Sequence, residues 1–195
     1  MTPIPPLLLA STSAHRRALL ARLGLPFQCQ PPGIDEEEHP GEAPAVRAAR
    51  LALAKARAVA ASFPGAIVIG SDQVASLDGR TAALLHKPGD RDTCRHQLAA
   101  MSGQAVRFDT GVAVVQGNLV LEHLDLTRVH FRRLDPAAIE SYMDREPSFD
   151  CAGGFKCEGL GVTLFESIET HDPTALVGLP LIAVCAALRR LGVAV

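Results

Sequence analysis

The sequence has no tryptophan and only one tyrosine, and aromatic residues make up 4% of its 195 residues. Neither charge is in clear excess, because 19 Lys and Arg stand against 21 Asp and Glu, a formal net charge of −2. Proteins that bind nucleic acid polymers usually carry a basic face, and those that hold single strands add aromatic platforms. We therefore expect a small-molecule substrate and no nucleic acid polymer.

Long apolar runs and paired cysteines are also missing. No apolar run reaches the length of a membrane span, and Pro3, Pro5 and Pro6 interrupt the N-terminal stretch where a signal peptide would have its apolar region. The five cysteines form no C-x-x-C pair, and the seven histidines show no spacing typical of zinc sites. We expect no disulfide framework, no structural zinc, no membrane contact, and reduced thiols in a cytoplasmic protein.

The hydrophobic content of 48% is enough for one domain, residues 1–195, with one or two lobes sharing a core. Residues 27–43 are rich in proline, glycine and acidic side chains, which predicts a loop. Strands and helices alternate on either side of a central hairpin, and this pattern predicts an α/β fold with a mixed twisted sheet flanked by helices. The expected strands are 7–10, 67–69, 105–115, 119–123, 126–132 and 161–168, and the expected helices are 14–23, 43–61, 90–101, 136–145 and 179–191.

The first expected strand leads directly into a cluster of small hydroxyl residues, Ser11 to Ser13, and then into a helix that carries Arg16. Hydroxyls and free backbone N–H groups at a helix N-terminus, backed by arginine, suit a negatively charged oxygen group such as phosphate. Ser13 and Arg16 are therefore candidate phosphate ligands. His15 lies between them, which sets it apart from the other histidines, whose pattern is typical of surface residues.

Two acidic segments could take part in catalysis. Asp72 follows the expected buried strand 67–69, where a carboxylate can hold a divalent cation or activate water, or can simply cap the next turn. The run from Asp35 to Glu38 lies in the predicted loop, where acidic residues are usually solvated. A nucleotide enzyme nevertheless needs carboxylates for magnesium, so both interpretations of the run remain open.

Lysine is rare, with only Lys55, Lys87 and Lys156 in the chain. Lys55 lies in an alanine-rich helix, where a solvated face is the simpler interpretation, and Lys87 precedes Pro88 in a loop. Either could act as a point charge toward phosphate. The glycine-rich segment 151–161 matches neither a Walker A nor a dinucleotide-binding motif. Its two cysteines have no His–Asp arrangement nearby, so a nucleophilic thiol is not expected.

Seven segments together resemble the Maf family, in the order expected for that family and over almost the whole chain. Each segment alone is a weak match to the family, but seven segments in the family's order are a strong match. They include the Ser-x-x-Arg segment, the acidic loop, the helix bearing Lys55, the segment around Asp72 and the Lys87-Pro88 loop. The matching residues are 9–20, 33–36, 53–56, 69–74, 86–88, 152–159 and 176–180.

The resemblance implies a nucleoside triphosphate pyrophosphatase, which hydrolyses its substrate to a nucleoside monophosphate and pyrophosphate. It implies two lobes around a deep nucleotide-binding cleft of the Maf/ITPase type, and a divalent cation, Mg²⁺ or Mn²⁺. Asp72, Lys55 and Lys87 would be catalytic, and Glu36 would hold the metal together with Asp72. Ser13 and Arg16 would bind the triphosphate. A homodimer is left open.

The positions that contact the base in this family hold His15, Gln73 and Glu158. Gln73 and the segment around Glu158 resemble the YceF-type subgroup, which favours 7-methyl-GTP. That subgroup often has tryptophan where this chain has His15, although an imidazole can also stack on a base. Two alternatives stay open: a nucleotide-binding regulatory protein in septum formation without significant turnover, and a phosphotransferase, for which no acceptor site is visible.

Overall fold

The fold is a seven-stranded mixed sheet in the computed structural model, which describes residues 5–77 and 83–195. The strand order is β2-β1-β3-β5-β6-β7, and β4 pairs with β3. β1 is parallel to β2 and β3, and the other pairs are antiparallel. The predicted mixed α/β fold is confirmed. The strands are β1 (Leu7–Leu9), β2 (Gln28–Cys29), β3 (Ile67–Leu77), β4 (Leu84–Leu85), β5 (Ala105–Gln116), β6 (Leu119–Phe131) and β7 (Phe165–Glu169).

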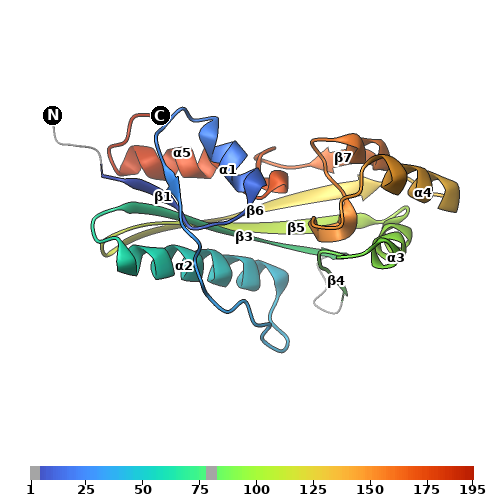
Figure 1. Ribbon diagram of the computed structural model, residues 1–195, viewed down its shortest axis with the longest axis horizontal. Coiled ribbons are helices and arrows are strands. Elements are labelled where there is room, and N and C mark those ends of the chain that lie inside the picture. Colours follow the sequence, from blue (N-terminus) through green and yellow to red (C-terminus); the bar gives the residue numbers. More distant parts are fainter. Residues whose placement is uncertain (1–4, 78–82) are drawn as a thin grey trace.

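Within the described residues, five α-helices pack around the sheet (Figure 1). At the end of the molecule near β1, α1 and α5 lie on one face of the sheet and α2 lies on the other. α3 and α4 lie at the other end of the long axis. The side chains of Ser13, Asp90 and Asp135 cap α1, α3 and α4, each accepting a backbone N–H three residues on. No helix within the described ranges is long and apolar enough to cross a membrane. The helices are α1 (Ala14–Ala21), α2 (Pro44–Ser62), α3 (Arg91–Met101), α4 (Pro136–Arg145) and α5 (Leu181–Arg190).

The strands depart from the prediction in several places. β3 continues to Leu77 instead of ending at residue 69, because it pairs with β5 over residues 68–77. β6 is one continuous strand instead of two, since β5 pairs with its residues 119–130 without a break. The predicted strand 161–168 is a 3₁₀ helix over Leu160–Leu164 followed by β7, and the predicted loop 27–43 contains the short strand β2.

The hydrophobic core has separate parts at the two ends of the long strands. Near β1, apolar residues pack beneath α1 and α5 on one face and beneath α2 on the other. At the far end, Phe108, Phe131 and Phe155 anchor a core that includes residues of α3 and α4. Between them lies a polar band, which we define as residues 71–73 of β3 and 109–110 of β5. This division supports two lobes, while the depth of a cleft between them stays a prediction.

Two glycines of the sheet let α2 approach the polar band closely. A Cβ on Gly70 would lie 2.3 Å from the carbonyl oxygen of Ala52, and one on Gly111 would lie 2.5 Å from that of Ala48. Side chains alternate along a strand, so Asp72 is on the same face as Gly70 and points toward α2. The close packing of α2 on these glycines therefore brings its side chains to Asp72.

Candidate active site

A buried charge cluster lies where α2 crosses the polar band. Lys55, 5% exposed, places its Nζ 2.6 Å from Oδ1 of Asp72, which is 7% exposed. The same Nζ lies 2.8 Å from Oε1 of Glu36, whose side chain is about half exposed. The ammonium of Lys55 thus contacts two carboxylates, that of Glu36 in the acidic loop and that of Asp72 in β3.

This geometry corrects the two simpler interpretations of these residues. Lys55 is not on a solvated helix face, because α2 presses that face against the sheet. Asp72 is neither a turn cap nor at a strand end, since it lies in the middle of β3 opposite Gly111. Burying two charges is costly unless they are paired, so the Lys55–Asp72 pair stabilises an arrangement that would otherwise be unfavourable.

The N-terminus of α1 adds a cation to this cluster. The Ser13 hydroxyl accepts the backbone N–H of Arg16 at 3.4 Å, and Arg16 Nε donates to the carbonyl of Gly178 at 2.8 Å. Burial lowers the pKa of the Arg16 guanidinium from its usual value, and the negative charges of Asp72 and Glu36 oppose that shift. Arg16 is therefore attracted electrostatically by the same two carboxylates that contact Lys55.

The amide of Gln73 is fixed by contacts on the face of the sheet opposite α2. Its Nε2 donates to the carbonyls of Ala175 and Leu176 at 3.0 and 3.2 Å, and lies 3.0 Å from the hydroxyl oxygen of Thr110. Carbonyls only accept, so the nitrogen has to face them. Gln73 can therefore offer a ligand its amide oxygen, an acceptor, and not its amide nitrogen.

His15 and Glu158 come together from distant parts of the chain. His15 Nδ1 lies 3.0 Å from Glu158 Oε1, and each side chain is about two-fifths exposed. Two of the three predicted base-contact residues are therefore in direct contact. Lys87 is exposed in the segment that follows β4, and its catalytic role stays a prediction.

Several neighbours of the site were not predicted from the sequence. The Ser71 hydroxyl is 2.7 Å from the carbonyl of Gly111 and 3.0 Å from that of Gly178, which also accepts from Arg16. Thr110 is directly opposite Gln73 in the β3–β5 register. The segment 176–180 belongs to a family motif, and its backbone carbonyls make tertiary contacts that no local pattern indicates.

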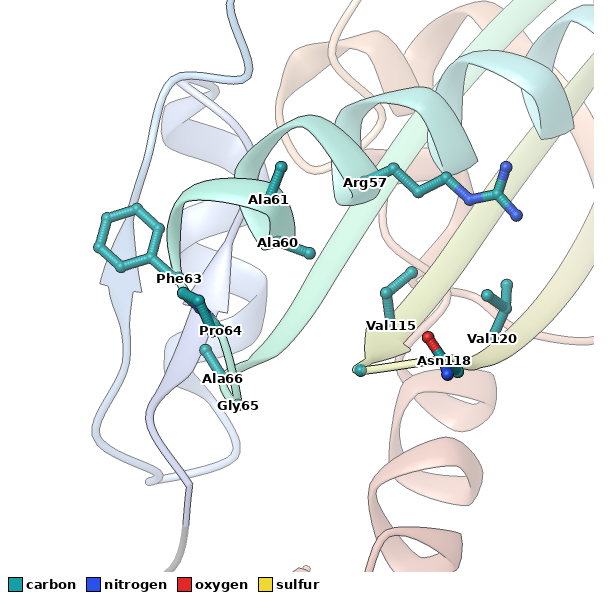
Figure 2. Close-up of a pocket in the computed structure, with 11 residues that line it drawn as sticks. Arg57, Ala60, Ala61, Phe63, Pro64, Gly65, Ala66, Val115, Asn118 and Val120 are labelled. Carbon is teal, nitrogen blue, oxygen red and sulfur yellow. The ribbon is translucent and has the colours of Figure 1, made fainter.

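A cavity of about 350 Å³ lies away from these residues, between the C-terminal end of α2 and the β5–β6 turn (Figure 2). Its wall is mostly alanine, glycine and valine, with Arg57, Phe63 and Asn118 at its edges. None of the predicted site residues lines it. The cavity is therefore distinct from the charge cluster.

The sequence matches the family model described as Maf-like protein over residues 6–191. The chain belongs to the Maf family. The matched range includes all seven motifs of the resemblance. In the fold, these motifs lie at the polar band, at the N-terminus of α1, and in neighbouring segments.

Curated relatives cover nearly the whole chain. A protein of Xanthomonas oryzae pv. oryzae (strain MAFF 311018) named 7-methyl-GTP pyrophosphatase is 57% identical over 97% of this chain and 98% of its own. A Bordetella avium protein with the same name is 50% identical over 96% of this chain and 94% of its own. Among solved structures, the Staphylococcus aureus Ham1 protein is 12% identical with a TM-score of 0.46, covering 65% of this chain and 71% of its own.

Proposed function

We propose that this Maf-family chain is a hydrolase that cleaves 7-methyl-GTP, or a related modified nucleotide, to the nucleoside monophosphate and pyrophosphate. The observation that carries the proposal is the buried Asp72–Lys55 pair, joined by Glu36. A protein that only bound a nucleotide would need the cations but not a buried carboxylate among them. The names of the relatives agree with this reaction.

In this proposal the cations bind and neutralise the triphosphate. Ser13 and Arg16 hold phosphate oxygens at the N-terminus of α1, where the helix dipole favours negative charge. Lys55 and Lys87 stabilise the charge that develops on the phosphoryl oxygens and on the leaving pyrophosphate. Asp72 orients or deprotonates the attacking water, and its burial keeps it positioned for that role.

Glu36 and Asp72 fit a hard divalent cation, Mg²⁺ or Mn²⁺, by the chemistry of their donor atoms. Both are carboxylates, the ligand type such ions prefer, and one lysine nitrogen already holds an oxygen of each. When bound there, the cation would offset phosphate charge and polarise the scissile phosphoryl group. We also propose a cytoplasmic location, which an odd number of cysteines without a C-x-x-C pair favours.

In this proposal, hydrogen-bond acceptors of Gln73 and Glu158 select the base of the nucleotide. The Gln73 amide can offer only its oxygen, and Glu158 offers carboxylate oxygens. The Watson–Crick edge of guanine presents two donors, the N1–H and the exocyclic amine, which acceptors of this kind match. The positive charge of a 7-methylguanine would add a Coulomb attraction to Glu158. His15, already beside Glu158, would stack on the base.

A substrate panel tests this function. Canonical and modified nucleoside triphosphates are offered with Mg²⁺, and pyrophosphate and monophosphate are measured separately. We expect the highest kcat/KM for 7-methyl-GTP and no turnover after chelation of the metal. Tight nucleotide binding with no turnover of any triphosphate would instead support a regulatory binding protein.

Replacing Glu158, a proposed hydrogen-bond acceptor for the base, should reduce the discrimination between nucleotides. In Glu158→Gln, we expect the preference for 7-methyl-GTP over ATP to fall about tenfold, because a bidentate base contact is worth about 1–3 kcal/mol and 1.4 kcal/mol is tenfold. The measurement is kcat/KM for both nucleotides. Glu37→Gln, in the exposed acidic run, is the control and should leave the preference unchanged.

An unchanged preference in Glu158→Gln would show that specificity lies elsewhere. His15→Ala separates stacking from chemistry. It should raise KM for 7-methyl-GTP while kcat stays near that of the unmodified protein, because His15 does not touch Asp72 or Lys55 in this account.

A further inference from the structure

A second group of metal-binding side chains lies beside the N-terminus of α1. His15, Asp150 and Cys151 each place one ligand atom within 4.8 Å of the others. His15 comes from α1, whereas Asp150 and Cys151 come from the loop after α4, more than a hundred residues later. The spacing of these residues in the sequence therefore gave no sign of a site, and only the fold assembles it.

We propose that His15, Asp150 and Cys151 form a binding site for a borderline-soft divalent cation, specifically Zn²⁺. An imidazole, a thiolate and a carboxylate are the three ligand types that zinc takes in proteins, and three protein ligands leave a fourth position open. The oxygen-only set of Glu36 and Asp72 suits a harder ion. The two sites would thus take different metals.

The contact between His15 and Glu158 supports this assignment independently. Metal-binding histidines usually donate their second ring N–H to a carboxylate, which fixes the tautomer and the ring orientation. Glu158 Oε1 lies 3.0 Å from His15 Nδ1. With the proton on Nδ1, the Nε2 lone pair of His15 is available to a metal.

The loop that carries Asp150 and Cys151 is held by buried groups next to it. The hydroxyl oxygens of Tyr142 and Ser148 lie 3.1 Å apart, and both residues are almost fully buried. The backbone N–H of Cys151 donates to the carbonyl of Ser148 at 3.2 Å, and that of Gly154 donates to the carbonyl of Cys151 at 2.9 Å. The two ligands are therefore set on a fixed segment.

Two features have to change when the metal binds. Burial raises the pKa of the Cys151 thiol to about 12, so Zn²⁺ forms the Zn–S bond by displacing the thiol proton, which passes to solvent. The ammonium of Lys156, 3.8 Å from Asp150 Oδ1, has to turn away. A tetrahedral zinc separates its ligand atoms by roughly 3–4 Å, and Cys151 Sγ and Asp150 Oδ1 already lie 3.6 Å apart.

The site would link zinc to the proposed function. Zn²⁺ on His15 would fix the ring and place positive charge beside the groups proposed to bind the cationic base, so Zn²⁺ should inhibit hydrolysis even in excess Mg²⁺. This consequence rests on the proposed function, but metal binding itself does not.

Cobalt titration tests the site directly, because a thiolate bound to Co²⁺ gives a charge-transfer absorption in the near ultraviolet and carboxylates do not. The full chain is titrated with Co²⁺ in excess Mg²⁺, and Zn²⁺ is then added. We expect one equivalent of Co²⁺ to give the band and Zn²⁺ to abolish it. Cys151→Ser should lose the band, and His15→Ala should weaken Co²⁺ binding about tenfold or more.

Cys157→Ser is the matched control, because Cys157 lies in the same glycine-rich segment and burial also raises its pKa to about 12. It should keep the band. Circular dichroism checks that both cysteine variants are folded. No band in the unmodified protein, or a band that survives in Cys151→Ser, would overturn the proposal.

In the hydrolysis assay, Cys151→Ser should keep its Mg²⁺-dependent rate and need at least about tenfold more Zn²⁺ for half inhibition. If no hydrolysis is detected, the absorption result still decides the metal site.

Discussion

Asp72→Asn should lower kcat for 7-methyl-GTP hydrolysis by about a hundredfold or more and leave the fold intact. The amide keeps the shape of the side chain but cannot accept a proton or balance a cation, and a positioned acid–base group contributes about 10²–10⁴ in rate. Lys55 keeps Glu36 as a partner at 2.8 Å, so no buried charge is left alone. Steady-state kinetics and thermal unfolding measure the two effects.

Asp125→Asn provides a matched control. Asp125 is also a buried aspartate of the sheet, in β6, and burial raises the pKa of its carboxyl. It is not part of the Lys55 cluster, so this variant should keep near-normal kcat. If Asp72→Asn were folded and turned over as well as this control, Asp72 would not be the catalytic carboxylate.

Lys55→Met should reduce both stability and activity. Removing the ammonium leaves Asp72 buried beside an apolar side chain, and breaking a buried ion pair costs about 3–5 kcal/mol. The electrostatic attraction between Arg16 and Asp72 offsets part of this loss, so we expect the low end of that range. The loss of a cation near the developing phosphate charge should lower kcat/KM by about a hundredfold. Urea unfolding and kinetics measure the two effects.

The double variant Lys55→Met/Asp72→Asn distinguishes pairing from general damage to the core. With no buried charge left unpaired, it should recover part of the lost stability while its activity stays as low as that of Asp72→Asn. If the losses of unfolding free energy in the two single variants simply added up in the double variant, the two side chains would not interact. The 2.6 Å contact between Lys55 and Asp72 would then not contribute to stability.

Local signals were enough to predict most helices and the first strand. Pro136 after Asp135 predicts the start of α4, and the structure begins that helix at Pro136. The predicted helix 14–23 forms as α1, which ends at Ala21 with Arg22 as its C-cap, two residues before the predicted end. Such positions depend on caps and backbone geometry, which a few neighbouring residues determine.

Long strand pairing could not be predicted in the same way. The segment Gly70 to Gln73 contains a glycine and polar residues, which are typical of a turn, yet β5 extends it as strand over ten paired residues. The polar residues are tolerated because Lys55 pairs with Asp72 and backbone carbonyls accept from Ser71 and Gln73.

The candidate site was predictable as a set of residues but not as an arrangement. Scarce lysines and an isolated aspartate were recognisable in the sequence. Their contact was not, because it depends on Gly70 and Gly111 admitting α2 to the sheet. The link between Arg16 and Gly178 joins residues 162 positions apart, and no local pattern indicates such a contact.

The most direct test of the account is the position of solvent oxygen in the products of 7-methyl-GTP hydrolysis. The full chain is incubated with 7-methyl-GTP and Mg²⁺ in heavy-oxygen water, and initial products are analysed by mass spectrometry. Attack of water at the α-phosphorus predicts one heavy oxygen in the nucleoside monophosphate and none in pyrophosphate. Heavy oxygen in pyrophosphate, or nucleoside diphosphate with labelled orthophosphate, would contradict the account.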